Sequence, residues 1–430
     1  MKANGNHVQQ LVDHLFRREA GKMIGVLTRI FGVENMELAE DVVQDALLEA
    51  IDHWSYEGTP DRPDAWLYRV ARNKALNILN REKYKKKYLS DSSRPLIREQ
   101  TIQPEWDQVF SNNEIHDDQL RMIFTCSHPA ISRDSQVALA LRTLCGFSIP
   151  EIARAFLSND ETIHKKLVRA RQKIRDDKIP FEVPRHEELA IRLDVVLETI
   201  YLLFNEGYSA SSGEDLIRYE LCEEAIRLAE IVNDHPGIKK KGKCSALLSL
   251  MYLNASRFKA RLDGEANLLS LAEQDRSLWD MKMVDTGLHW LAEAGKANEI
   301  NQYYLLAAIS ANYCIARDFD SIDWKNILIL YDHLELLDHS PLVTLNKSIA
   351  VSKVYGQQKG LELLKTIENN PLIESYHLFY STRAEFFQQL GFAESALDSL
   401  RMAMKMCSLA TEKKFLQGKI DRCLAAIRES

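Results

Sequence analysis

The stretch DAWLYRVARNKALNILNR, residues 64–81, decides the fold and the function expected of this chain. Placed at 100° per residue, its side chains separate into an apolar and a polar face. The apolar face holds Leu67, Val70, Ala71, Ala75 and Ile78, and the polar face holds Arg69, Arg72, Asn73, Asn77 and Asn80, flanked by Lys74 and Arg81. The stretch therefore predicts an amphipathic helix that opens at Asp64 and buries one side.

The polar face of this helix suits nucleic acid. Arginine and lysine neutralise phosphates, and asparagine can both donate to and accept from a base edge. Around the preceding loop and the first helical turn lie four aromatic residues, Trp54, Tyr56, Trp66 and Tyr68. Exposed rings beside cations are what unstacked bases need. Two plainer interpretations stay open, because many polar helix faces are only solvated and any one of these rings can belong to the core.

The charge of the chain is segregated along its length. Its 430 residues carry a net charge of -7, which taken alone argues against nucleic acid. Residues 34–64, however, contain ten acidic side chains and one basic, whereas residues 69–87 contain eight basic and one acidic. A third segment, residues 161–175, contains six basic side chains and one acidic. The basic surface is thus confined to two segments near the amino-terminal end.

The second basic segment has the spacing of a helix-turn-helix. Residues 135–145 predict an apolar helix, and residues 149–156 predict a second helix with Ser148 as its N-cap. After a turn at residues 157–159, a helix from Asp160 onward buries one stripe, formed by Ile163, Leu167, Ala170 and Ile174. The polar side of that last helix suits a major groove, and a bare helical hairpin is the alternative.

The whole chain predicts an all-α fold, because apolar residues recur every three or four positions and no period-two run appears. Beyond the second basic segment lies a long helical array, with turn signals at residues 205–207, 233–237, 338–341 and 369–371. Small and apolar residues near its end follow the spacing of a tetratricopeptide repeat: Ala384, Phe387, Gly391, Ala396, Leu400 and Ala403. An irregular helical bundle is the alternative.

Composition excludes several classes of protein. Hydrophobic residues make up 46% and charged residues 27%, which is globular rather than disordered or collagenous. No stretch approaches the roughly 18–20 apolar residues of a membrane span, and the start lacks the apolar core of a secretory signal, so a cytoplasmic protein is expected. Seven cysteines without a CxxC pair are expected to be reduced and mostly buried.

No cofactor, metal site or enzyme activity is predicted. Three histidines and a carboxylate invite a metal interpretation, but no HExxH or Ser-His-Asp arrangement supports it: His289, His333, His339 and Glu335. A ligand-binding role for Asn205, Glu206 and Tyr208 is weighed against a role in forming a turn, and the turn is preferred.

Residues 39–47 (AEDVVQDAL) and 66–76 (WLYRVARNKAL) resemble region 2 of the sigma-70 superfamily. Residues 144–171 resemble its region 4, through LCGFS, EIA and LVRAR. Order and spacing are similar to those of the extracytoplasmic-function (ECF) sigma factors of bacterial RNA polymerase. Residues 204–208 (FNEGY) and 275–280 (DRSLWD) look like landmarks of the ECF subgroup that carries a long carboxy-terminal tetratricopeptide-like extension.

This resemblance implies a domain order for the all-α chain. Region 2 would occupy residues 1–88 and bind both core polymerase and the -10 element. Residues 89–116 would be a linker, and residues 117–180 would be the region 4 helix-turn-helix that binds the -35 element. Residues 181–430 would form a helical extension that is tetratricopeptide-like towards its end.

The resemblance also assigns roles to residues. Docking on the clamp helices of the largest catalytic subunit of RNA polymerase would use Asp41, Gln44, Asp45 and Glu49. The -10 element would be contacted by Trp66, Arg69, Arg72, Asn73, Lys74, Asn77 and Arg81, with a flipped base captured by the loop at residues 55–62. The -35 element would be contacted by Thr162, Lys165, Lys166, Arg169 and Lys173. Asp160 and Glu161 depart from the common pattern, and would either cap the helix or accept hydrogen bonds from cytosine.

The function implied is that of a sigma factor, which directs core RNA polymerase to promoter DNA and helps to melt the -10 region without a covalent step. The carboxy-terminal array would be a regulatory or protein-interaction domain acting in cis. The alternative is a helix-turn-helix regulator whose helical array senses a ligand or a protein and which does not dock on polymerase.

Overall fold

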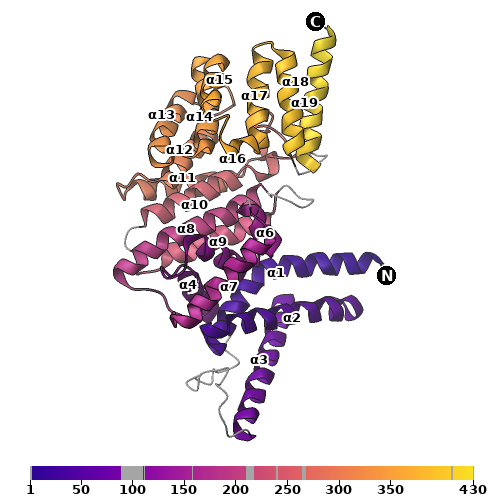
Figure 1. Ribbon diagram of the computed structural model, residues 1–430, viewed down its shortest axis with the longest axis vertical. Coiled ribbons are helices and arrows are strands. Elements are labelled where there is room, and N and C mark those ends of the chain that lie inside the picture. The colour runs from indigo at the N-terminus through magenta and orange to yellow at the C-terminus, as the bar shows by residue number, and fades with distance from the viewer. Residues whose placement is uncertain are drawn as a thin grey trace. The chain divides into compact units, whose positions relative to one another are not determined.

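The computed structural model of the chain describes residues 2–88, 110, 112–156, 158–209, 217–238, 241–263, 268–407 and 410–429 (Figure 1). This described part contains nineteen α-helices and no strand, apart from an isolated antiparallel bridge between Leu262 and Leu268. The predicted all-α fold is confirmed. None of the described helices combines the length and the apolarity that a membrane crossing requires. The linker predicted at residues 89–116 lies mostly outside the described residues.

The chain divides into two compact units. The first comprises Met1–Gly207 and Tyr219–Lys239, and the second comprises Tyr208–Arg218 and Lys240–Ser430. The extension predicted to start at residue 181 therefore supplies helices to both units.

The first unit begins with three long helices and a short 3-10 turn: α1 (Lys2–Phe31), η1 (Val33–Asn35), α2 (Met36–Glu57) and α3 (Pro63–Tyr88). Gly32 and Gly58 separate them with positive φ values of 91° and 86°, a backbone conformation that favours glycine. The predicted amphipathic helix is α3, which opens one residue before Asp64. Its residues Leu67, Ala71 and Ala75 are fully buried against the bundle, as the helical wheel predicts.

Four shorter helices follow in the same unit: α4 (Asn112–Cys126), α5 (Arg133–Leu144), α6 (Ile149–Ala155) and α7 (Asp160–Asp176). Gly146, with φ 65°, turns the chain between α5 and α6. Ser148 and Glu151 form a capping box at the start of α6, since the Glu151 carboxylate accepts from both the backbone N–H and the hydroxyl of Ser148. The predicted cap and the predicted buried stripe of α7 are both present.

Two further helices complete the first unit, α8 (His186–Tyr208) and α9 (Tyr219–Asp234). Arg192 of α8 is buried and donates to the backbone carbonyl of Phe124 at 3.1 Å. Arg133 of α5 donates to Glu198 of α8 at 2.6 and 2.9 Å. These contacts attach α8 to α4 and α5, so the segment beyond residue 180 is an integral part of this unit.

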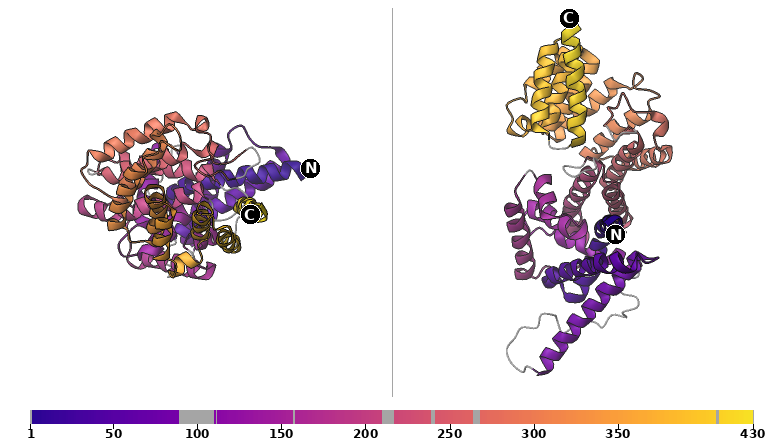
Figure 2. Two further views of the ribbon diagram at one scale, coloured as in Figure 1. Left: turned by 90° about the horizontal axis from the view of Figure 1, so that it is seen from above. Right: turned by 90° about the vertical axis from the view of Figure 1, so that its right-hand side faces the viewer.

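The second unit is a succession of helices that pack mainly on their neighbours along the chain. They are α10 (Gly242–Ala255), α11 (Met281–Gly295), α12 (Gln302–Ile315), α13 (Trp324–Leu337), α14 (Pro341–Tyr355), α15 (Gln357–Lys365), α16 (Pro371–Glu374), α17 (His377–Gln389), α18 (Ala393–Met406) and α19 (Ala410–Glu429), with short 3-10 turns at Phe258–Ala260 and Arg276–Leu278. Helices α17, α18 and α19 lie side by side (Figures 1 and 2). Such a succession of neighbouring contacts is typical of helical arrays.

Most of the predicted turns of the array are confirmed, and one is wrong. Helices end or begin at residues 233–237, 338–341 and 369–371, where Asn370 caps α16. Residues 205–207, in contrast, lie inside α8. A single glycine close to the end of a helix costs only about 1 kcal/mol, and the burial of Phe204 and Glu206 on this helix outweighs that local preference.

The residues expected to form a repeat unit belong to α17, to α18 and to the turn that joins them. Ala384, Ala396, Leu400 and Ala403 are buried there, and Gly391 joins the two helices with φ 82°. Gly356, with φ 92°, joins α14 to α15 in the corresponding manner 35 residues earlier. Lys353, at the position of Phe387, lies 5.1 Å from the ring of Phe319. The tetratricopeptide interpretation stays a prediction.

Candidate nucleic-acid interface

The polar face of α3 is open to solvent. Arg69, Asn73, Asn77 and Arg81 are exposed, and Arg72 and Lys74 are half-buried. Within the described residues, Arg69 and Arg81 make no ion pair. Because Leu67, Ala71 and Ala75 pack against the bundle on the opposite side, Arg69 and Asn73 stand on the packed part of the helix. The face offers cations for phosphates and amides for base edges.

The four aromatic side chains near α3 divide between core and surface. Trp54 is 2% exposed and belongs to the core. Trp66 is half-buried and packs on the Trp54 ring at a centroid distance of 5.3 Å. The Tyr68 ring stacks on the Phe110 ring at a centroid distance of 5.0 Å, and its hydroxyl donates to Glu19. Burial, followed by the charge of Glu19, raises the pKa of this hydroxyl. Tyr56, at 87% exposed, is the fully available ring of the four.

The loop expected to capture a flipped base is shorter than predicted. Residues 55–57 are still helical in α2, so the loop starts at Gly58 and runs to Arg62. Helix α2 continues because Trp54 keeps this turn on the core, and it ends where Gly58 takes a positive φ. Tyr56 therefore projects from the last turn of α2.

The acidic side chains of α2 form an outer set, which also includes the amide Gln44, and an inner set. The outer set is Asp41, Gln44, Asp45 and Glu49, and all four are exposed. Leu48, which was not among the predicted site residues, is 61% exposed among them. It lies four and three residues from Gln44 and Asp45, on the same helix face. A helical-wheel projection of α2 would have shown Leu48 as a leucine on a polar helix face.

An ion pair connects the outer set to the polar face of α3. The Glu49 carboxylate pairs with the Lys74 ammonium at 2.9 Å. The two surfaces that were predicted for polymerase and for the -10 element therefore adjoin along α2 and α3.

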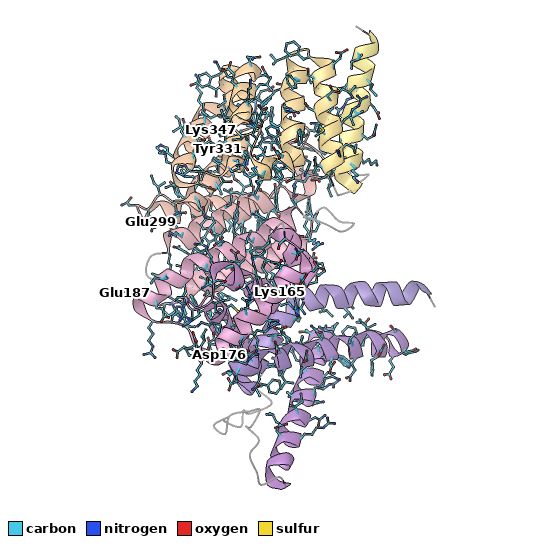
Figure 3. The ribbon with its side chains drawn as sticks, viewed as in Figure 1. Lys165, Asp176, Glu187, Glu299, Tyr331 and Lys347 are labelled. Atoms are coloured by element: carbon cyan, nitrogen blue, oxygen red, sulfur yellow. The ribbon has the colours of Figure 1, made fainter. Side chains whose placement is uncertain are left out.

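The exposed side of α7 is basic, but its lysines are paired. Lys165 pairs with Glu161 at 2.7 Å, Lys166 with Asp134 at 2.9 Å and Lys173 with Asp177 at 2.9 Å. Arg169 is exposed and Thr162 half-buried. Lys165 and Asp176, the last residue of this helix, are labelled in Figure 3. The pairing leaves the surface close to neutral at its lysines.

Asn159 caps α7. Its side-chain oxygen accepts from the backbone N–H of Thr162 at 2.9 Å. The alternative in which Asp160 and Glu161 would cap this helix is wrong. A short amide one residue before the helix has the reach for the N3 donor, whereas Glu161 lies inside the first turn and turns to Lys165.

The inner acidic set of α2 binds arginines of α7. Arg171 donates from one guanidinium nitrogen to both carboxylate oxygens of Glu40, at 2.7 Å each. Their side chains are 12% and 9% exposed. Arg142 of α5 lies 3.8 Å from Glu40, and Arg175 lies 3.7 Å from Glu37. We call the contact of Glu37 and Glu40 with these three arginines the α2–α7 clasp.

Close contacts also join α1 to α5 and α4. A Cβ atom on Gly21 would lie 2.1 Å from the backbone oxygen of Leu144 in α5, so only glycine permits this approach. Arg29 of α1 donates to the fully buried Asp118 of α4 at 2.7 Å. Burial, the largest influence, raises the pKa of Asp118 despite its partners Arg29 and Arg121. Sequence periodicity gave no signal for these contacts, since they join residues about 90 to 130 positions apart.

Known proteins match this architecture in two parts. Residues 15–84, which span most of α1 to α3, match the family model described as sigma-70 region 2. This part of the chain is therefore similar to sigma-70 region 2, and the match supports the sigma-70 superfamily. Residues 192–295 match a family of unknown function, DUF6596.

A relative along nearly the whole chain defines the family. Over 407 residues the chain is 33% identical to a protein of Rhizobium meliloti (strain 1021) described as uncharacterized, covering 94% of this chain and 93% of that protein. The chain belongs to the family of that rhizobial protein. No solved structure matches it.

Proposed function

We propose that this protein is an ECF-type sigma factor that binds core RNA polymerase and directs it to promoters. The observation that carries the proposal is the sigma-70 region 2 match on α1–α3, together with an acidic and a cationic surface that adjoin on those helices. One bundle can then hold a basic protein surface and a DNA strand side by side. Such a protein performs no covalent chemistry.

The outer acidic set of α2 is the proposed docking surface for the clamp helices of the polymerase. Asp41, Gln44 and Asp45 supply charge and hydrogen-bonding groups, and the exposed Leu48 supplies apolar contact at the centre of the patch. Charges at the rim of an interface steer association, while a buried apolar anchor supplies affinity. Glu49 joins this surface after exchanging Lys74 for a polymerase cation.

The polar face of α3 is the proposed -10 surface. Arg69, Arg72, Lys74 and Arg81 would hold phosphates, while Asn73 and Asn77 would contact bases. The exposed ring of Tyr56 and the half-buried ring of Trp66 can stack on unpaired bases. Binding extruded bases more favourably than stacked ones shifts the duplex towards its open form.

Helix α7 is the proposed -35 surface, through Thr162, Lys165, Lys166, Arg169 and Lys173. Its lysines would exchange their carboxylate partners for phosphates, so binding is expected to depend on salt. On this proposal α6 and α7 form the helix-turn-helix of region 4.

The two DNA surfaces lie too close together to engage a promoter in this arrangement. The ion pairs Lys74–Glu49 and Arg171–Glu40 connect α3, α2 and α7. Helical rise adds about 14 Å between Glu40 and Glu49 and about 9 Å between Arg171 and Lys165. Including side chains, Lys74 and Lys165 can be no more than about 60 Å apart. The names of the -10 and -35 elements place them about 25 base pairs apart, which corresponds to about 85 Å of B-form DNA at 3.4 Å per base pair.

The α2–α7 clasp must therefore open when the protein engages a whole promoter. We propose that docking on polymerase opens it, because the clasp uses Glu37 and Glu40 on the same helix as the docking surface. The free protein would then hold its two DNA-binding surfaces in an inactive arrangement.

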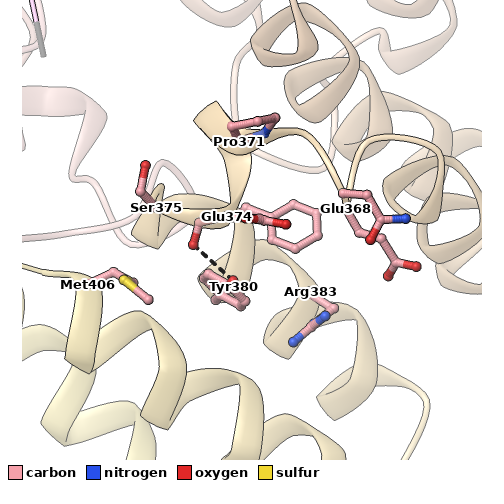
Figure 4. Close-up of a pocket in the computed structure, with 9 residues that line it drawn as sticks. Glu368, Pro371, Glu374, Ser375, Tyr380, Arg383 and Met406 are labelled. Carbon is pink, nitrogen blue, oxygen red and sulfur yellow. Dashed lines mark hydrogen bonds between the residues drawn. The ribbon is translucent and has the colours of Figure 1, made fainter.

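The second unit is the proposed regulatory domain. Its helices present a hollow lined by charged and aromatic side chains, in which Arg383 lies 5.2 Å from the Tyr380 ring and the Tyr380 hydroxyl donates to the Glu374 carbonyl at 3.0 Å (Figure 4). Such a surface suits a protein segment with both charged and apolar side chains. Removing residues 240–430, while keeping α8 and α9, should alter promoter-directed transcription or its response to signals, and unchanged output would discard this role.

Transcription in vitro with purified core polymerase on genomic DNA tests the main proposal. Start sites that appear only when the full-length protein is added would support it. The competing function is a helix-turn-helix regulator that binds duplex promoters without polymerase. A pull-down with core polymerase in the absence of DNA separates the two, since the regulator should not be retained.

A further inference from the structure

Three side chains that can bind a metal converge at one end of α17, α18 and α19. His377 is the first residue of α17, Cys407 directly follows α18, and Glu412 lies in the first turn of α19. The donor atoms of the three residues all lie within 4.8 Å of one another. Cys407 is 4% exposed, and the side chains of Glu412 and His377 are 12% and 20% exposed.

The spacing of these atoms fits tetrahedral coordination. Oxygen Oε2 of Glu412 lies 3.3 Å from Nε2 of His377 and 3.3 Å from Sγ of Cys407. Zinc bonds of about 2.0–2.2 Å to nitrogen and oxygen and about 2.3 Å to sulfur place neighbouring ligands about 3.4–3.6 Å apart. The Glu412–His377 and Glu412–Cys407 distances are already close to this length. The His377–Cys407 distance is no more than 4.8 Å and needs only a small movement of the side chains.

The contacts among the three residues leave room for a metal ion. The Cys407 thiol can donate to Glu412, which accounts for their contact. Nε2 of His377 is buried and lies 3.3 Å from the Glu412 carboxylate, with which it forms an ion pair only when the imidazole is protonated. In the neutral imidazole, a lone pair on Nε2 would face the carboxylate. A metal ion between the three donors would bind both groups.

The electrostatics of the site also suit a cation. The Glu412 carboxylate accepts from the Cys407 thiol and lies beside the His377 ring. One thiolate and one carboxylate would neutralise a divalent ion, because metal binding releases the thiol proton.

We propose that His377, Cys407 and Glu412 bind a divalent transition-metal ion, and that zinc is the ion that fits best. A sulfur, nitrogen and oxygen donor set favours zinc over magnesium or calcium, which prefer oxygen ligands. Three protein ligands leave the fourth position to water. Because the ligands come from three helices, the ion ties the end of the array together and couples its stability to metal supply.

Cobalt(II) titration of the full-length, metal-free protein tests the site. One equivalent should produce d–d bands of tetrahedral intensity and a thiolate-to-cobalt charge-transfer band, and zinc should displace the cobalt. Cys407→Ser should abolish the charge-transfer band. Cys423→Ser is the matched control, since Cys423 is buried in the same core cluster and is not a ligand.

Affinity and stability give independent checks that do not need Cys407→Ser to fold. His377→Gln should weaken cobalt binding by about 100-fold or more, since even second-shell partners of metal ligands are worth about 10- to 100-fold. One equivalent of zinc, but not of magnesium, should raise the unfolding temperature of the native protein and not that of His377→Gln. Absence of the charge-transfer band in the native protein, or its persistence in Cys407→Ser, would refute the site.

Discussion

The two basic helices of the first unit, α3 and α7, differ in what their cations face. On α3, Arg69 and Arg81 extend into solvent without an ion pair in the described part of the chain. On α7, Lys165, Lys166 and Lys173 each pair with a carboxylate, and Arg171 binds Glu40 of α2. Similar composition thus produces one helix with exposed arginines outside ion pairs and one helix whose lysines are paired.

This difference suggests an order of events. A phosphate that approaches Arg69 or Arg81 of α3 would displace little more than water and counterions, whereas at Lys74 it must displace Glu49. A phosphate that approaches α7 must also displace carboxylates, and full promoter engagement must break a nearly buried ion pair. We expect α3 to be ready in the free protein and α7 to become fully available after polymerase opens the α2–α7 clasp.

The largest expected effect concerns the buried ion pair of α7. Arg171→Met should lower the free energy of unfolding of the first unit by about 3–5 kcal/mol, because it leaves Glu40 buried without its principal partner. Lys165→Met removes an exposed pair from the same helix and should cost no more than about 1 kcal/mol. Chemical denaturation of the full-length variants measures both. If both substitutions lowered the free energy of unfolding equally, the buried Arg171 pair would contribute no more to stability than the exposed Lys165 pair.

The double variant Glu40→Leu with Arg171→Met sharpens this result. Replacing both partners with apolar side chains removes the unpaired charge, so most of the lost stability should return. Chemical denaturation of the double variant measures this recovery, and a stability as low as that of Arg171→Met alone would contradict it.

The next effect concerns the docking surface beside α3. The double variant Asp41→Lys with Asp45→Lys should weaken binding to core polymerase by about 100-fold, or about 2.7 kcal/mol, through like-charge repulsion at the interface. Glu187→Lys with Asp285→Lys makes the same change in net charge at exposed positions elsewhere and is the control. Fluorescence anisotropy with labelled protein gives the affinities. If Asp41→Lys with Asp45→Lys bound core polymerase as tightly as the native protein, α2 would not be part of the interface.

A smaller effect is expected on α3 itself. Asn73→Ala with Asn77→Ala should reduce transcription about tenfold or more, because each base contact is worth about 1–3 kcal/mol. Binding to core polymerase should not change, since the outer acidic set of α2 is intact. The defect should persist on a template that is already melted at -10, because the lost contacts are with unpaired bases. Normal initiation would mean that this face is only solvated.

The smallest effect concerns the paired lysines of α7. Glu161→Gln releases Lys165 and should strengthen binding to a random-sequence duplex about threefold, the scale of one exposed ion pair. Arg169→Ala should reduce the slope of log affinity against log salt by about one. Titrations at several salt concentrations test both. An unchanged affinity in Glu161→Gln would show that α7 is not hindered by its own carboxylates.

Local periodicity predicted a large part of the candidate interface. The packed side of α3, the buried stripe of α7 and the Ser148 cap all follow from side chains within one or two helical turns of each other. The same local signals predicted a turn at residues 205–207, which are helical. They also placed the start of the loop after α2 at residue 55, whereas it starts at Gly58. In both places burial of a large side chain, Phe204 or Trp54, holds the helix together beyond its local preference.

The sequence by itself determined an all-α chain, its segregated charges and the helix faces on which the candidate residues lie, because these depend on neighbours along the chain. Only the tertiary structure decided which charges are free. Arg171 meets Glu40 across 131 residues, and Cys407 meets His377 across thirty. Such pairs form because folding brings distant helices into contact, and a helical period of 3.6 residues carries no information about the partner on another helix.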